Sequence, residues 1–165
     1  MKIHVTGNSG SGKTTFAKEL GDTLSLPVFG LDKVVWRAGW QKTPPDQRVR
    51  LERELMKQPA WIIEGVSAQV RQAADIIVFL DVARPVAYAR ALKRNLPYLF
   101  KSRPELPEDC PEYKLALRHL KLVWNFKGQI RPNIMRDMHL HPEKFLVVKT
   151  TADRAAAISK LQLQK

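Results

Sequence analysis

The feature that most constrains the fold is the run from Gly7 to Thr14, which reads Gly-Asn-Ser-Gly-Ser-Gly-Lys-Thr. It satisfies the pattern G-x-x-x-x-G-K-[ST] in full. The run follows a short apolar segment and opens a stretch with helical spacing, which is the strand–loop–helix context that a phosphate-binding loop requires. The sequence therefore predicts an α/β domain that binds a nucleoside triphosphate.

The residue types of this loop each have a chemical reason. Glycines let the backbone curl so that successive N–H groups point into one concavity. The following helix N-terminus favours anions. Lys13 is expected to reach the β- and γ-phosphates of ATP, and the Thr14 hydroxyl to bind Mg²⁺. The residues expected to bind ATP and Mg²⁺ are Gly7, Asn8, Ser9, Gly10, Ser11, Gly12, Lys13, Thr14 and, at the α-phosphate, Thr15.

The rest of the chain alternates short apolar runs with longer amphipathic ones, which is typical of an α/β protein with a parallel sheet. The apolar runs predict strands at 3–5, 27–29, 61–63, 76–80 and 145–148. The amphipathic runs predict helices at 13–24, 46–57, 85–95, 112–126, 128–138 and 152–163. We predict one three-layer P-loop domain over 1–165, with a parallel sheet of about five strands and a helical lid insert within 95–135, where prolines interrupt the pattern.

Composition limits the setting and the partners. Cys110 is the one cysteine, so no internal disulfide can form, and no apolar run approaches the roughly 18 residues of a membrane helix. We therefore expect a cytoplasmic protein. The net charge is +12, and it is uneven: 1–83 hold 11 Lys and Arg against 9 Asp and Glu, and 84–165 hold 17 against 7. A basic half attracts either nucleic acid or phosphorylated small molecules, and charge alone does not separate them.

Acidic residues follow three of the predicted strands. Glu64 ends the third strand and Asp81 the fourth, and both are candidates to hold Mg²⁺ because the carboxyl ends of such strands face the ligand crevice. Asp32 follows the second strand and could orient or deprotonate an acceptor hydroxyl.

Basic and aromatic residues complete the candidate site. Arg90 and Arg94 are four apart, so they share a helix face and could clamp phosphate oxygens in the transition state. Weaker candidates for such contacts are Arg131 and Arg103 on a closing lid, and Arg71 and Arg37 at an acceptor phosphate. Trp36 and Trp40 are either packing residues or the walls of a pocket that stacks on an acceptor base.

These residues in order resemble the adenylate-kinase-related family often labelled topology-modulation proteins. The resemblance is carried by Gly7–Thr14, Leu31-Asp32, Trp36, Gly39-Trp40, Trp61–Gly65, Ala74–Ile77, Leu80-Asp81, Arg90, Arg94, Cys110–Glu112, Trp124-Asn125 and Arg131-Pro132. It implies a nucleoside-monophosphate-kinase-like fold, ATP binding and a lid that bears arginines, and the label suggests an influence on DNA supercoiling. The sequence departs from the family pattern at Glu64, where the family has Asp, and at Val66-Ser67, where it has Asn-Tyr.

Three functions stay open at this point. A small kinase is favoured, because the sequence has neither the Asn-Lys-x-Asp run of GTPases nor the His-Arg-Asp loop of protein kinases. It would move the γ-phosphoryl of ATP to a small acceptor, with a nucleotide or nucleoside expected. The alternatives are a nucleotide-gated DNA- or RNA-binding regulator, for which we find no reading module, and an ATPase without acceptor. The acceptor and the oligomeric state are not predicted.

Overall fold

The computed structural model describes residues 1–102, 106–111, 113 and 116–164. Its main sheet has five parallel strands in the order β2-β5-β1-β6-β7. The strands are β1 (Lys2–Gly7), β2 (Val28–Gly30), β5 (Trp61–Glu64), β6 (Ile76–Leu80) and β7 (Phe145–Val148). This sheet confirms the predicted α/β fold class, and it places β1, which leads into the phosphate loop, at the centre.

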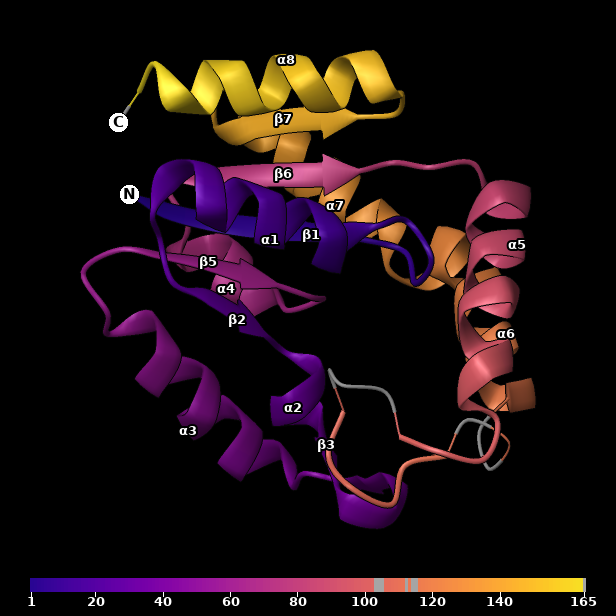
Figure 1. The fold of residues 1–165 in the computed structure, drawn as a ribbon. Coiled ribbons are helices and arrows are strands. Elements are labelled where there is room, and N and C mark those ends of the chain that lie inside the picture. Colours follow the sequence, from indigo (N-terminus) through magenta and orange to yellow (C-terminus); the bar gives the residue numbers. More distant parts are fainter. Residues whose placement is uncertain (103–105, 112, 114–115, 165) are drawn as a thin grey trace.

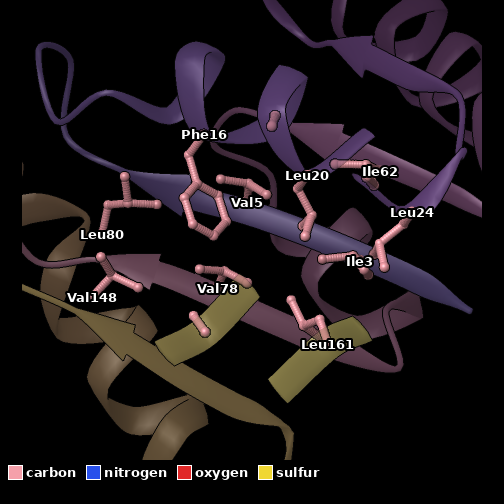
Figure 2. Packing of buried hydrophobic residues seen from close by; sticks show 12 residues of the cluster. Ile3, Val5, Phe16, Leu20, Leu24, Ile62, Val78, Leu80, Val148 and Leu161 are labelled. Carbon is pink, nitrogen blue, oxygen red and sulfur yellow. The ribbon is translucent and has the colours of Figure 1, made fainter. Parts of the chain in front are cut away.

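Two helices cover one face of the sheet, α1 (Lys13–Leu24) and α8 (Thr151–Gln162) (Figure 1). Figure 2 shows Phe16, Leu20 and Leu24 of α1 packed over Ile3 and Val5 of β1. The four-residue spacing of these helical residues places them on one face, as the sequence predicts. Burial of this face fixes α1, and with it the start of the phosphate loop, against the sheet.

The opposite face is covered by α2 (Asp32–Val35), α3 (Pro45–Met56), α4 (Ala68–Ala73) and α7 (Arg131–Leu140). Successive strand residues point to opposite faces. Ile62 accordingly packs on the α1 side, while its neighbours Trp61 and Ile63 pack toward α2 and α4. The sheet is therefore buried on both faces, which gives the predicted three layers.

Two further helices stand beside the edge at which the parallel strands end, α5 (Arg84–Asn95) and α6 (Ala116–Gln129) (Figure 1). Between them in the chain come η2 (Leu96–Tyr98) and the proline-rich segment 99–115, which is called the insert from here on. The helices predicted at 112–126 and 128–138 correspond to α6, which begins at Ala116, and α7 (Arg131–Leu140), with a break at Ile130. Residues 112, 114 and 115 of the first prediction lie outside the described residues. Pro132 lies in the first turn of α7, where its missing N–H costs no hydrogen bond.

The structure adds short elements that the sequence does not predict. An antiparallel hairpin is formed by β3 (Trp36–Arg37), η1 (Ala38–Trp40) and β4 (Gln41–Lys42), and η4 (Pro142–Lys144) precedes β7. Strands of two residues have no readable periodicity. The hairpin also depends on positive φ angles, 69° at Gly39 and 58° at Trp40, and propensity disfavours the second of these.

Candidate active site

The phosphate loop joins β1 to α1, and at Gly10 it lies close to the backbone of α5. Gly10 has a φ of 78°, in the left-handed region that favours glycine. A Cβ atom at this position would lie 2.1 Å from the carbonyl oxygen of Ala87 in α5. Glycine therefore lets the loop lie directly against the α5 backbone.

The amino end of α1 is open to a ligand. Among the described residues, no side chain caps this end, and its first turn contains no acidic residue. In contrast, Thr150 and Asp153 form a complete capping box at the start of α8. Uncapped N–H groups at a helix N-terminus favour an anion, so the start of α1 fits a phosphate group.

Two cavities meet at the loop. The first, here the loop cavity, has a volume of about 370 Å³ and is lined by Gly10, Gly12, Lys13, Thr14, Thr15, Lys18, Arg90 and Arg94. The second, here the central cavity, has a volume of about 330 Å³ and lies toward α2, the β3–β4 hairpin and α6. Lys13, Thr14 and Arg94 line both cavities. A group that passes from one cavity to the other would pass these three residues.

Hydrogen bonds hold the loop and tie it to α6. The Lys13 Nζ donates to the carbonyl oxygen of Asn8 at 2.9 Å. The Asn8 side chain donates to the carbonyl oxygen of Val123 at 2.9 Å, and this bond is buried. The shape of the loop is therefore coupled to the helix that follows the insert.

Thr14 and Glu64, the two predicted metal ligands, lie together. Thr14 Oγ1 donates a hydrogen bond to Glu64 Oε1 at 3.2 Å, and Glu64 is buried at the end of β5. The described residues contain no cluster of three or more His, Cys, Asp or Glu that could hold a metal ion. Mg²⁺ usually binds one or two carboxylates together with substrate phosphates, so a hydroxyl and a carboxylate beside the phosphate loop fit Mg²⁺.

Asp81, the rival metal candidate, pairs with Arg131 instead. The guanidinium donates from Nε to Oδ1 at 2.9 Å and from Nη2 to Oδ2 at 2.8 Å. This hydrogen bonding lowers the pKa of the Asp81 carboxyl below its ordinary value. Arg131, a candidate lid arginine, is thus held at the start of α7 by a bidentate ion pair.

Arg90 and Arg94 both line the loop cavity from α5. Arg94 also lines the central cavity, and its Nη2 donates to Ser9 Oγ in the loop at 3.3 Å. A second bond, from Nε to Asn95 Oδ1 at 3.2 Å, fixes the same guanidinium. Arg94 is therefore placed where the two cavities meet, whereas Arg90 lies on one side only.

The central cavity has a charged part and an apolar part. Its charged lining consists of four cationic side chains and two carboxylates: Lys13, Lys42, Arg48, Arg94, Asp32 and Glu64. Its apolar lining consists of Leu31, Val35, Trp36, Trp40, Val66, Leu122, Phe126 and Ile130. The excess of positive charge suits an anionic ligand, and the aromatic wall suits a ligand with a flat apolar portion.

Arg48 is a site residue that the sequence reading missed. It projects from α3, where its Nε donates to Glu52 Oε1 at 2.7 Å and its Nη2 to the carbonyl oxygen of Val66 at 3.1 Å. Glu52 is buried and also accepts from the Ser67 hydroxyl at 2.5 Å. The four-residue spacing of Arg48 and Glu52 indicates an ion pair on a helix, but the cavity beside it comes from the tertiary fold.

Trp40 of the hairpin is hydrogen-bonded to residues of the insert. Trp36 and Trp40 meet edge to face, with ring centroids 5.2 Å apart. The Trp40 Nε1 donates to the carbonyl oxygen of Pro111 at 2.8 Å, and its backbone N–H to Cys110 Sγ at 3.4 Å. The Cys110 thiol in turn donates to the carbonyl oxygen of Arg37 at 3.5 Å and is completely buried. Cys110 and Pro111 therefore lie against one wall of the central cavity.

Two of the weaker candidates, Arg71 and Arg37, lie outside both cavities. Arg71 is buried and donates to Asp137 Oδ2 at 2.6 Å, away from both cavities. Arg37 is exposed and contacts the Gln47 side chain. Arg103 lies outside the described residues. Thr15, the weaker loop candidate, lines the loop cavity.

Comparisons with known proteins show which structures share this fold. The sequence matches no family profile and no curated protein. A shikimate kinase from Acinetobacter baumannii is 21% identical, with a TM-score of 0.57 over 98% of this chain and 91% of that one. A putative kinase from Chloroflexus aurantiacus is 16% identical, with a TM-score of 0.56 over 99% and 97%. A gluconokinase from Sinorhizobium meliloti is 14% identical, with a TM-score of 0.52 over 99% and 94%.

At these identities the likeness shows the fold alone, an α/β fold that this chain shares with these three kinases. Membership in the topology-modulation family stays a prediction. In the described part of the chain, every helix is too short or too polar to span a bilayer.

Proposed function

We propose that the protein is an ATP-dependent kinase that transfers the γ-phosphoryl group to a small acceptor, and we favour a nucleoside or nucleotide as that acceptor. The observation that carries this proposal is the meeting of two cavities at Lys13, Thr14 and Arg94. Both cavities are lined by residues of the phosphate loop. The loop cavity suits the triphosphate, and the central cavity, with its aromatic wall, suits a second substrate. An ATPase without acceptor has no need of the second cavity.

Residues at the junction supply the transfer chemistry. Lys13 and Arg94 place positive charge beside the transferred group, where charge is spread over its oxygens in the transition state. Thr14 and Glu64 would hold Mg²⁺, which adds positive charge at the β- and γ-phosphate oxygens when bound. Arg90, on the loop cavity alone, contacts the nucleotide rather than the acceptor.

Asp32 deprotonates or orients the acceptor. It stands at the start of α2 and lines the central cavity. With a hydroxyl acceptor, the acceptor oxygen bonds to the γ-phosphorus as the bond from that phosphorus to the β–γ bridging oxygen breaks. The hydroxyl proton passes to the Asp32 carboxylate, and ADP leaves. With a phosphate acceptor no proton moves, and Asp32 orients the acceptor through hydrogen bonds.

The lining of the central cavity supports an anionic acceptor with a flat ring. Trp36 and Trp40 offer an aromatic wall on which a base can stack. Arg48 and Lys42 offer cationic groups for an acidic group on the same molecule. The names of the shikimate kinase and the gluconokinase describe small-molecule kinases, which supports the class without naming this acceptor.

The insert between α5 and α6 acts as a lid in this proposal. It contacts the hairpin wall of the central cavity through Cys110 and Pro111. Closure there excludes water, which would otherwise take the phosphoryl group. A cytoplasmic location fits, because ATP is used there and a lone thiol stays reduced.

The proposal is tested by ATP consumption with Mg²⁺, alone and against a panel of nucleoside monophosphates, nucleosides and small hydroxy compounds. We expect one acceptor class to raise turnover well above background and to be recovered phosphorylated. We expect Lys13→Met to lower that turnover at least 100-fold, the scale for losing one preorganised charge contact. Lys57→Met, at an exposed ion pair with Glu54, is the matched control and should match wild type.

Two outcomes contradict the proposal. Unchanged turnover in Lys13→Met rejects the assignment of the phosphate loop. Hydrolysis that no acceptor stimulates, with ATP binding intact, favours an ATPase or a nucleotide-gated binder, and duplex binding measured against salt concentration then separates these.

A further inference from the structure

His4 is a polar residue in the middle of the central strand, and it is completely buried. Its backbone is in register with Ile63 of β5 and Ile77 of β6. Ile3 and Val5 pack on the α1 side of the sheet, so His4 points to the opposite layer. Neither cavity is lined by His4, and it therefore does not touch a substrate.

The His4 imidazole holds the backbone of a neighbouring turn. Its Nε2 lies 3.2 Å from the carbonyl oxygen of Gly65. A carbonyl oxygen only accepts, so Nε2 carries the proton. Burial, with Arg71 nearby, lowers the pKa of His4 to about 3, which keeps the ring neutral. Nδ1 is then an acceptor, and no described residue donates to it.

This arrangement is unfavourable for packing alone. A buried nitrogen without a hydrogen-bond partner destabilises the folded state. Valine or isoleucine would fill a central parallel strand without that penalty. What His4 adds, relative to an apolar residue, is the N–H that bonds to Gly65.

Gly65 directly follows Glu64, and its turn is tightly confined. Its φ is 139°, and a Cβ atom there would lie 2.7 Å from Leu31 Cβ. The Leu31 N–H donates to the carbonyl oxygen of Glu64 at 2.9 Å, and the Gly65 N–H donates to that of Val5 at 3.0 Å. These two bonds hold the Glu64–Gly65 peptide from both sides. His4 adds a bond to the carbonyl of the next peptide, between Gly65 and Val66, so the turn that follows Glu64 is fixed as well.

We propose that His4 is a positioning residue for the pair Thr14 and Glu64: by holding the Gly65 carbonyl, the imidazole keeps the Glu64 carboxylate in place for Mg²⁺. The inference rests on the proposed function, because it takes this pair as the Mg²⁺ site. Partners that orient a metal ligand without touching the metal change metal affinity about 10–100-fold when they are removed.

The test compares two variants that carry the same amide with different reach. In His4→Gln the amide nitrogen can come near the place of Nε2, while in His4→Asn it cannot. ATP binding is measured by calorimetry over a series of Mg²⁺ concentrations. We expect His4→Asn to raise the Mg²⁺ concentration that gives half-maximal enhancement of ATP binding about tenfold or more. In His4→Gln this concentration should remain close to that of wild type. Binding of ATP without Mg²⁺ should be unchanged in both.

Thr6→Val is the matched control. Thr6 is buried on the same strand and the same face as His4, and its hydroxyl likewise has no hydrogen-bond partner among the residues described. This variant should need no more Mg²⁺ than wild type. The inference is overturned if His4→Asn keeps the wild-type Mg²⁺ requirement or if Asn and Gln shift it equally. A loss of metal-free ATP binding as large as the loss with Mg²⁺ also overturns it.

Glu64→Gln distinguishes a failure of the proposed metal pair from a failure of the role of His4. If this variant leaves the Mg²⁺ requirement unchanged, the metal pair of the proposed function is wrong, and the role of His4 is rejected with it. If Glu64→Gln raises the requirement and His4→Asn does not, the metal pair stands and His4 is a packing residue only.

Discussion

The indole N–H of Trp40 donates a hydrogen bond of 2.8 Å to the carbonyl oxygen of Pro111, which joins the β3–β4 hairpin to the insert between α5 and α6. The same tryptophan also lines the central cavity. Because one side chain takes part in both contacts, the position of the insert and the shape of the cavity wall are linked. Cys110, buried between the backbone of Arg37 and that of Trp40, extends this link.

We expect Trp40→Phe to weaken binding of the acceptor without weakening binding of ATP. The substitution keeps an aromatic ring in the wall and removes the N–H that bonds to Pro111. A neutral hydrogen bond contributes about 1 kcal/mol, so the KM for the acceptor should rise roughly fivefold. Steady-state kinetics with each substrate varied in turn give the two KM values.

Trp124→Phe is the control for this prediction. Trp124 is 60% exposed on α6 and lies under the guanidinium of Arg84, away from the central cavity. Both KM values should be unchanged in this variant. If Trp40→Phe changes the KM of both substrates equally, the bond from Trp40 to Pro111 has no specific effect on binding of the acceptor.

The sequence predicts the sheet and the strand–loop–helix setting of Gly7 to Thr14 well, because both depend on local patterns. The apolar run at 76–80 has to be buried on both faces, and a run such as Gly7 to Thr14 between a strand and a helix is typical of a phosphate-binding loop. The predicted neighbours Thr14 and Glu64 also meet in the structure. Parallel strands bring their carboxyl ends to one edge of the sheet, so this meeting follows from the strand assignments.

The rest of the site depends on tertiary contacts that no local pattern encodes. Arg48 reads as one half of an ion pair on a helix, and its place in the cavity wall becomes visible only in the fold. Asp81 has the same strand-end position as Glu64, but it pairs with Arg131, which is 50 residues away in the sequence. Trp40 stands out as an aromatic residue, while its positive φ and its partner Pro111 do not.

Arg94→Ala should slow phosphoryl transfer far more than it weakens ATP binding. Arg94 lines both cavities and is held by Ser9 and Asn95, so its charge is fixed beside the transferred group. We expect kcat to fall about 100-fold or more, with a much smaller change in the Kd of ATP. Arg90→Ala is the comparison, because Arg90 lines the loop cavity and not the central cavity. This variant should weaken ATP binding more than it lowers kcat. Matching losses in kcat and Kd for Arg94→Ala would reduce it to a ground-state contact.

The ion pair of Asp81 with Arg131 should make stability depend on pH at the acid end. The hydrogen bond from Arg131 lowers the pKa of the Asp81 carboxyl below its ordinary 3.8. A lowered folded-state pKa gives stability that is present above the unfolded value and is lost as pH falls through the folded value. In urea unfolding from pH 7 to 3, Asp81→Asn should therefore be less stable than wild type at neutral pH, with the gap closing below about pH 4.

The control for this pH dependence uses the partner residue. In an Arg131→Ala background, Asp81 loses the group that lowers its pKa most, while the smaller effects of Lys149 and Lys127 remain. Asp81→Asn should therefore reduce the free energy of unfolding at neutral pH much less than it does in wild type. The gap between the two proteins should then change little with pH. If the stability difference closes with acid in the Arg131→Ala background as it does when Arg131 is present, the pH dependence belongs to another group near Asp81.

Gly10→Ala should destabilise the fold and remove ATP binding together. The residue has a φ of 78°, and its Cβ would lie 2.1 Å from the Ala87 carbonyl oxygen, so the loop and α5 would have to separate. We expect a loss of about 2 kcal/mol or more in the free energy of unfolding, measured with urea. Gly128→Ala is the matched control, since that glycine lies in α6 and the added Cβ would meet no described atom within 4 Å apart from the neighbouring residues and backbone of its own helix. It should instead stabilise the protein by up to about 1 kcal/mol. Similar stabilities of the two variants would mean that the loop and α5 can part without cost, and that their contact does not shape the phosphate site.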